Sequence, residues 1–168
     1  MALVFQYGSN TSTRRINSPE RLRGDARSLG PARTVATFEL AFTVWSTGNN
    51  CAAADLIPGN GRQIWGVLYD IPDYLISRDT AHNRKSLDAI EGSKYQRQEI
   101  QVCGRHNLEI PVTALTYTVI DKHNNLKTSR EYVMHIIAGL TEHQVQAEYI
   151  DYVRNRAILN NPDLQGRI

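Results

Sequence analysis

The sequence predicts an α+β fold, in which a mostly antiparallel, barrel-like sheet carries flanking helices. Segments rich in Val, Thr, Phe and Trp prevail before Asp121, and helix-type apolar periodicity prevails after it. Strands and helices do not alternate regularly, which excludes a doubly wound parallel sheet. With 168 residues, the chain is expected to form one domain, residues 1–168, with a sizeable core.

The N-terminal apolar run, residues 3–7, is expected to be a buried strand that breaks into a tight turn at Gly8. A glycine can take positive φ, so consecutive backbone N–H groups can point into one hollow, to which Ser9 and Asn10 add side-chain hydrogen bonds. Such a hollow binds anions, although an ordinary turn has the same composition. A cap, a proline and an acidic residue then predict a short helix over residues 18–24.

Three strands are expected next. Residues 33–46 favour a long strand, and a turn at 48–50 leads into a second strand over 51–57. Residues 58–61, Pro-Gly-Asn-Gly, are the strongest turn in the chain and predict a hairpin between that second strand and residues 63–71.

The remainder combines one helical region, two strands and two helices. Pro72 opens the helical region, a polar stretch interrupts it at 78–84, and Gly92 ends it. Residues 95–102 and 109–121 are expected to pair as strands. A helix capped by Thr128 or Ser129 should end at Gly139. Thr141 and Gln144 predict a capping box for the final helix, and the tail after Asn160 is expected to be loose.

Composition narrows the classes of function. A formal charge of +2, spread among acidic residues, does not indicate nucleic-acid binding. The arginines between Arg14 and Arg33 could meet an anionic surface, but a solvated loop and helix face is favoured. Cys51 and Cys103 lie far apart, so neither a disulfide framework nor a metal site is indicated, and a cytoplasmic location is expected. No signal segment or membrane-spanning run is apparent.

Searches for familiar catalytic and cofactor motifs find none, and no metal or cofactor is predicted. The histidines show no metal-ligand spacing. They are His82, His106, His123, His135 and His143.

Glu91 stands out among the acidic residues. It follows Ile90 at the expected C-terminal end of a helix, where the helix dipole disfavours a carboxylate. Desolvation by apolar neighbours should raise its pKa, as a general acid/base working near neutral pH requires. A surface glutamate that precedes a C-cap glycine is the alternative. Asp88, three residues earlier, has no comparable signature.

Together these segments resemble the γ-glutamylcyclotransferase-like family. The family's Tyr-Gly-Ser-Asn strand end is matched by Tyr7-Gly8-Ser9-Asn10, and its Leu-Asp-x-x-Glu-Gly segment is matched by residues 87–92. Similar pieces follow in the family's order at 64–69, at 95–97 and in the terminal helices. The Gly-Leu-Pro element often found before the last helix is replaced by residues 142–145, Glu-His-Gln-Val, so a different segment over the substrate is expected.

The resemblance implies an enzyme without a cofactor. Family members let the free α-amine of a γ-glutamyl compound attack its own γ-carbonyl, which forms 5-oxoproline and releases an amine, amino acid or peptide. It implies Glu91 as the catalytic acid/base. The implied substrate-binding residues are Tyr7, Gly8, Ser9 and Asn10, with candidate tyrosines Tyr95, Tyr117 and Tyr132.

The implied partner is a small γ-glutamyl molecule, not a nucleic acid or a membrane. A second hypothesis is a catalytically silent module of the same fold that binds a γ-glutamyl compound or another anion. Glu91 argues against this hypothesis, because a nearby carboxylate repels an anionic ligand.

Overall fold

The computed structural model describes residues 1–77 and 83–168. Its strands are β1 (Ala2–Gln6), β2 (Arg27–Ser46), β3 (Cys51–Pro58), β4 (Arg62–Ile71), β5 (Tyr95–Gly104) and β6 (Val112–Val119). Its α-helices are α1 (Thr13–Ile16), α2 (Leu87–Glu91), α3 (Arg130–Glu142) and α4 (Ala147–Asn160). Short 3₁₀ helices are η1 (Ser9–Thr11), η2 (Asp73–Leu75) and η3 (Pro162–Leu164).

Five of these strands close into a barrel. The strand order is β3-β2-β4-β1-β6-β5, and β5 pairs back onto β2. Every pairing is antiparallel except that of β1 with β6. The first half of β2 closes the ring with β4 and β5, and its second half leaves the ring to pair with β3. The predicted α+β class, with a mostly antiparallel, barrel-like sheet, is confirmed.

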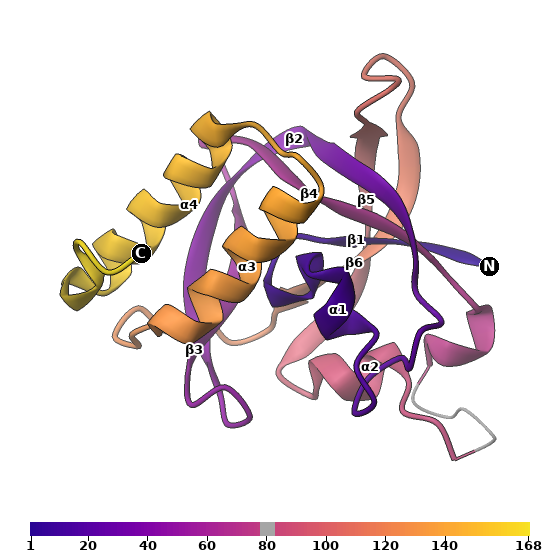
Figure 1. The fold of residues 1–168 in the computed structure, drawn as a ribbon, viewed down its shortest axis with the longest axis horizontal. Helices are drawn as coiled ribbons and strands as arrows, with labels where there is room; N and C mark the ends of the chain where they lie inside the picture. Colours follow the sequence, from indigo (N-terminus) through magenta and orange to yellow (C-terminus); the bar gives the residue numbers. More distant parts are fainter. Residues whose placement is uncertain (78–82) are drawn as a thin grey trace.

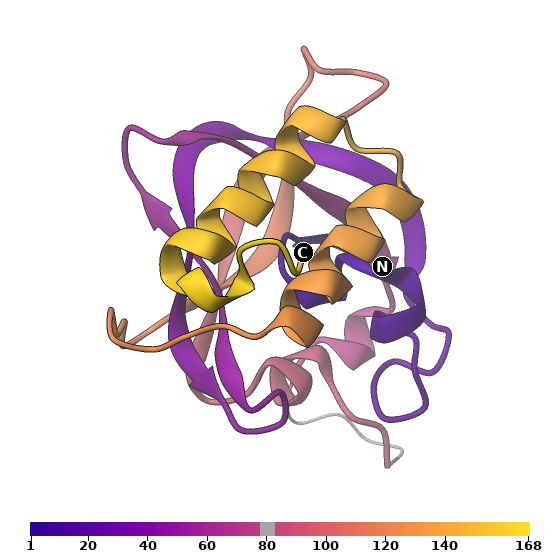
Figure 2. The same cartoon turned by 60° about the vertical axis from the view of Figure 1, so that its left-hand side comes forward.

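Helices α3 and α4 lie side by side against the barrel (Figure 1). Figure 2 shows the same pair from another direction, with the C-terminal segment beside it. Side chains of both helices, among them Ile136 and Val153, share one buried cluster with Phe5, Leu40 and Ile64 of the strands. The predicted strands at 33–46, 51–57, 95–102 and 109–121 are all present, with shifted ends.

The predicted hairpin between residues 51–57 and 63–71 is wrong. β3 and β4 pair with opposite edges of β2, since Phe38 is the partner of both Pro58 and Arg62. The turn between them therefore crosses β2. A Cβ on Gly61 would lie 2.1 Å from the carbonyl oxygen of Phe38, so only glycine fits this crossing.

The short helix expected over residues 18–24 is also wrong. These residues form turns, with positive φ at Arg23 and Gly24, and the turns bury Leu22 completely. The helix lies earlier, at α1, where the hydroxyl of Ser12 accepts a hydrogen bond from the backbone N–H of Arg15 at 3.3 Å. Ser12 is therefore the N-cap of this helix, the role that the sequence predicts for Ser18.

The region between Pro72 and Gly92 contains two short helices, η2 and α2. Gly92, with φ 90°, ends α2 as predicted. The polar stretch expected at 78–84 falls largely on residues 78–82, which lie outside the described residues, as does His82.

Gly139 does not end its helix, because α3 continues to Glu142. A Cβ on Gly139 would lie 2.3 Å from the backbone of Thr11 and of Ser12. The glycine therefore serves close packing of α3 on η1, the 3₁₀ turn that follows β1.

The expected capping box is absent, since Thr141 lies within α3 and α4 begins after Gln146, which makes no side-chain cap hydrogen bond. The tail is ordered rather than loose. Leu164 of η3 is buried in the main cluster, and Arg130 donates a hydrogen bond to the carbonyl of Arg167 at 2.9 Å.

Candidate active site

The predicted turn after β1 is formed by η1, which lies beneath α3. Gly8 has φ −97°, so positive φ is not the reason for a glycine here. A Cβ would instead come within 3.3 Å of the Tyr132 hydroxyl oxygen and 3.4 Å of the Ala54 Cβ, a tight fit. Ser9 and Asn10 are buried. Within the described residues, the backbone N–H groups of Ser9 and Asn10 have no hydrogen-bond acceptor, and two such donors can receive an anion.

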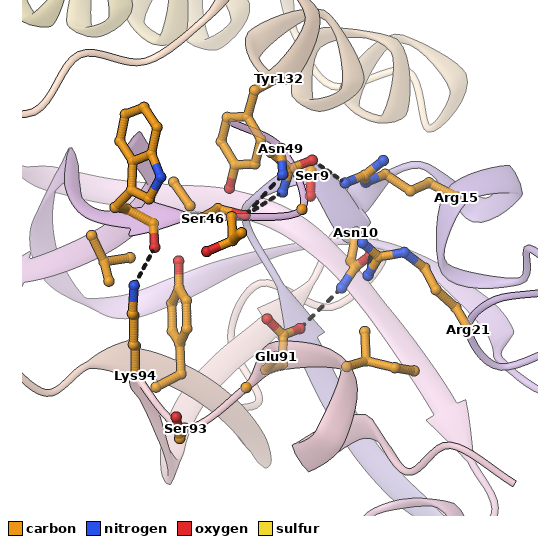
Figure 3. A pocket seen from close by; sticks show the side chains of 18 of the residues that line it. Ser9, Asn10, Arg15, Arg21, Ser46, Asn49, Glu91, Ser93, Lys94 and Tyr132 are labelled. Atoms are coloured by element: carbon orange, nitrogen blue, oxygen red, sulfur yellow. Dashed lines mark hydrogen bonds between the residues drawn. The ribbon is translucent and has the colours of Figure 1, made fainter. Parts of the chain in front are cut away.

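Glu91, the last residue of α2, lies against this turn. Its Oε1 accepts hydrogen bonds from the side-chain amides of Asn10 at 2.9 Å and Gln6 at 3.2 Å. Ser86 caps the helix by accepting a hydrogen bond from the N–H of Ala89. Figure 3 shows the carboxyl of Glu91 directed at Asn10 across the pocket.

Burial raises the pKa of Glu91, and this effect exceeds the opposing influence of Arg21, of the Asn10 and Gln6 hydrogen bonds, and of Arg15. Glu91 therefore holds a proton more readily than an exposed glutamate does, which is the property that a proton-transferring carboxyl needs.

Two arginines complete one side of the site. Arg21 donates to the Asn10 Oδ1 at 3.0 Å, so a chain of hydrogen bonds runs from Arg21 through Asn10 to Glu91. Arg15 donates to the Asn49 Oδ1 at 2.6 Å. Burial, and then repulsion from Arg21, lower the pKa of Arg15. Two neighbouring cations bound to neutral amides favour an anion between them.

The tyrosine hydroxyls of the site differ in their hydrogen-bond partners. Tyr7 donates to the carbonyl of Tyr117, Tyr95 to the carbonyl of Ala54, and Tyr117 to Asp88, each at 2.6 Å. These three protons already have protein acceptors.

Tyr132 differs, because its hydroxyl accepts from the Ala54 N–H at 2.9 Å. Burial raises the pKa of Tyr132 to about 12, so it stays protonated at neutral pH. Its hydroxyl also interacts with the side chain of Ser9, so both hydroxyl groups lie together at the inner hollow.

The structure places every predicted site residue around one small hollow of about 30 Å³. Its lining comprises Tyr7, Gly8, Ser9, Asn10, Glu91, Tyr95, Tyr117 and Tyr132, together with Gln6 and Ala54. A larger cavity of about 520 Å³ shares Ser9, Asn10, Glu91, Tyr95 and Tyr132 with it. The small hollow is thus the inner end of a larger site.

Sequence reasoning missed several residues of this site. Arg15 and Arg21 line the larger cavity, so the interpretation of these two as a solvated face is wrong. Both arginines lie close to Asn10 in the sequence, and this proximity could have indicated that they belong to the site. Gln6, one residue before the matched Tyr-Gly-Ser-Asn segment, was also missed.

The segment 142–145, which stands in place of the family's Gly-Leu-Pro element, lines neither hollow. Glu142 instead accepts from the Thr13 N–H at 3.3 Å, and the His143 ring is 2.9 Å from the Thr13 hydroxyl. Within the described residues, both hollows are lined without it.

The fold is of the α+β class, with a barrel and flanking helices, and comparison with known proteins identifies the family. The chain belongs to the AIG2-like family, whose model matches residues 63–153, more than half of the chain. The match includes Glu91 and begins after the turn at Gly8. No curated protein sequence matches the chain significantly.

Solved structures share the fold. A γ-glutamyl cyclotransferase superposes with a TM-score of 0.74 at 24% identity, covering 90% of this chain and 85% of that one. An uncharacterized human protein gives the same TM-score and coverage at 26% identity. A glutathione-specific γ-glutamyl cyclotransferase from yeast gives 0.51 at 12% identity, covering 93% and 97%. The resemblance to the γ-glutamylcyclotransferase-like family is confirmed.

In the described part of the chain, no helix has the length and apolar character needed to cross a membrane. The same residues contain no group of three or more side chains suited to hold a metal ion.

Proposed function

We propose that the protein is a γ-glutamyl cyclotransferase, which converts a γ-glutamyl amine, amino acid or peptide into 5-oxoproline and the released amine. The observation that carries this proposal is the position of Glu91. A carboxyl of raised pKa lies 2.9 Å from Asn10, and Asn10 belongs to a turn that lines the small hollow and has two backbone N–H groups without an acceptor in the described residues. We further propose one domain over residues 1–168 and a cytoplasmic location, which agrees with two free, buried cysteines.

The substrate is held by its α-carboxylate. The N–H groups of Ser9 and Asn10 donate to it, and Arg15 and Arg21 supply positive charge from the adjoining wall. This arrangement folds the glutamyl chain so that the α-amine approaches the γ-carbonyl. Because the attack is intramolecular, positioning alone supplies much of the rate acceleration.

Glu91 moves the proton. Its carboxylate takes a proton from the α-amine as the nitrogen attacks the γ-carbonyl carbon and a five-membered ring forms. The same carboxyl then donates that proton to the leaving nitrogen as the original amide C–N bond breaks. No other reactant is required, and Glu91 ends in its starting state.

Tyr132 is the best-placed donor for the oxyanion that forms on the γ-carbonyl oxygen. Its hydroxyl is buried, protonated and oriented by the Ala54 N–H, whereas Tyr95 and Tyr117 already donate to protein acceptors. We assign Tyr7, Tyr95 and Tyr117 to the walls of the inner hollow.

The test is 5-oxoproline formation from a panel of γ-glutamyl amides, amino acids and dipeptides, with calorimetry of glutamate and 5-oxoproline binding alongside. We expect 5-oxoproline and free amine in equal amounts from at least one member. Binding without product from any member would contradict the proposal and favour the catalytically silent binding module.

A further inference from the structure

A second hollow, of about 420 Å³, adjoins the 520 Å³ cavity. Val44, Trp45, Ser93 and Lys94 line both. Ser93 and Lys94 follow Glu91 directly in the chain, so the segment that carries the acid/base leads into this hollow. Figure 3 shows Ser93 and Lys94 on the opposite side of the pocket from Arg15 and Arg21.

The two hollows differ in chemistry. The larger one holds the charged side chains of Arg15, Arg21 and Glu91. The second gains the apolar side chains of Ile120 and Leu126, in addition to Val44 and Trp45. Trp45 is 39% exposed and Ile120 is 51% exposed, although both are large and apolar. Exposed apolar side chains that gather at one hollow mark a surface that binds an apolar group.

The direction of the substrate decides what that group is. The α-carboxylate end is fixed at Ser9, Asn10 and the arginines, so the leaving amine must extend past Glu91 on the side of Ser93 and Lys94. That path ends at Trp45. A tryptophan beside a pocket offers a large flat surface for stacking with little entropy loss.

Charge argues against a strongly cationic amine. Lys85 and Lys94 line the larger cavity, and Lys94 is held at its boundary with the second hollow by donating to the Trp45 carbonyl at 2.9 Å. An ammonium group passing this point meets like charge. Asp121 also lines the second hollow, so two lysines and one carboxylate, all of them exposed side chains, line the path and leave it with an excess of positive charge.

We propose that the second hollow receives the apolar or aromatic body of the released amine, so that the substrate is a γ-glutamyl amide of such an amine. This inference rests on the proposed function. It assigns specificity to Trp45 and Ile120, whose side chains take no part in the proton transfer.

The test compares kcat/KM for three substrates with the same glutamyl part: γ-glutamyl ethylamide, γ-glutamyl phenethylamide and the singly γ-glutamylated diaminobutane, which is cationic. We expect the phenethylamide to exceed the ethylamide by about tenfold or more. The diaminobutane conjugate should fall below the ethylamide. The readout is 5-oxoproline released by the full-length protein.

Variants locate the effect. Trp45→Ala should reduce the phenethylamide preference to about twofold or less, and Trp45→Phe should retain most of it, because the stacking surface is conserved. Ile120→Ser serves the same purpose if Trp45→Ala fails to fold. Ile110→Ala, at a residue 61% exposed between β5 and β6, is the matched control and should keep the preference.

The outcomes separate the two proposals. Equal turnover of the three amides, or a preference that survives Trp45→Ala and Ile120→Ser, would overturn the inference and leave the cyclotransferase intact. Absence of 5-oxoproline from all three amides and from the wider panel would overturn the proposed function and, with it, the inference.

Discussion

Glu91 occupies a position where burial opposes its charge while hydrogen bonds and arginines support it. Asn10 and Gln6 donate to one carboxyl oxygen, and Arg21 acts through Asn10. Burial remains the larger influence, so the pKa is raised. The protonated form of Glu91 is thus favoured more than that of an exposed glutamate.

This balance predicts how pH affects stability. The folded-state pKa of Glu91 lies above its ordinary value of 4.5, so the folded state binds more protons than the unfolded state between the two values. Ionisation of Glu91 therefore destabilises the folded state as pH rises through this window. Glu91→Gln has no carboxyl to ionise at this position. The free energy of unfolding of Glu91→Gln minus that of the wild type should therefore increase as pH rises.

Urea unfolding of both proteins at several pH values between about 4 and 8 measures the difference. Below pH 4.5 this difference should be independent of pH. A difference that falls with rising pH would mean that the carboxylate is stabilised, not strained, in the folded state.

At the scale of elements, α3 packs directly on the backbone of η1, the turn after β1, at Gly139. A methyl group there would meet the backbone of Thr11 and Ser12 at 2.3 Å. Thr11 is also the last residue of η1, which carries Ser9 and Asn10. Packing of α3 and shape of the turn are therefore coupled.

Gly139→Ala should lower the free energy of unfolding by about 1–3 kcal/mol, because overpacking outweighs the better helix propensity of alanine. Urea unfolding followed by circular dichroism measures it. Gly104→Ala is the control: its Cβ would meet nothing within 4 Å, and a change within about 0.5 kcal/mol is expected. Equal stability of both variants would contradict the packing role.

Asp55 ties β3 to the end of β6. Its side chain is completely buried and accepts from the Thr43 hydroxyl at 2.9 Å, the Val119 N–H at 3.0 Å and the Lys122 ammonium at 2.5 Å. Its neighbours on β3, Ala53 and Ala54, line the two site hollows. The ion pair thereby fixes one wall of the site.

Asp55→Ala should cost about 3–5 kcal/mol of stability, because it leaves buried donors without an acceptor. The exposed pair of Asp151 with Arg154 provides the comparison, and Asp151→Ala should change stability by no more than about 1 kcal/mol. Both are measured by denaturant unfolding. A similar small cost for both would show that burial of the Asp55 pair contributes little.

An element can be predicted from the sequence when the residues that determine it lie close together in the chain. The strands at 95–102 and 109–121 were found because alternation and turn residues lie within a few positions. The predicted hairpin at 58–61 is wrong because turn residues indicate only that the chain reverses direction. They do not indicate that β2 lies between the two strands that the turn connects. Gly139 was misread as a helix end because its reason is a contact with Thr11 and Ser12, far away in sequence.

At the scale of the whole molecule, closure of the barrel brings the site together. β1 runs beside both β4 and β6, and β6 pairs with β5, which follows α2. The turn after β1 thus meets Glu91, which lies 81 positions after Asn10. Both halves were found in the sequence by their own chemistry and by family resemblance. Arg15 and Arg21 were not, because a half-buried arginine that lines a cavity and a fully solvated one look alike in sequence.

The central claim is that Glu91 transfers the proton beside a substrate held by the turn. The most direct measurement is the rate of 5-oxoproline formation by the wild type, Glu91→Gln and the exposed-residue control Glu99→Gln, on the best substrate of the panel. Glu91→Gln should lose about 10²–10⁴-fold in kcat while keeping the circular dichroism spectrum of the wild type, and Glu99→Gln should be unaffected. Full activity in a folded Glu91→Gln protein would contradict the account.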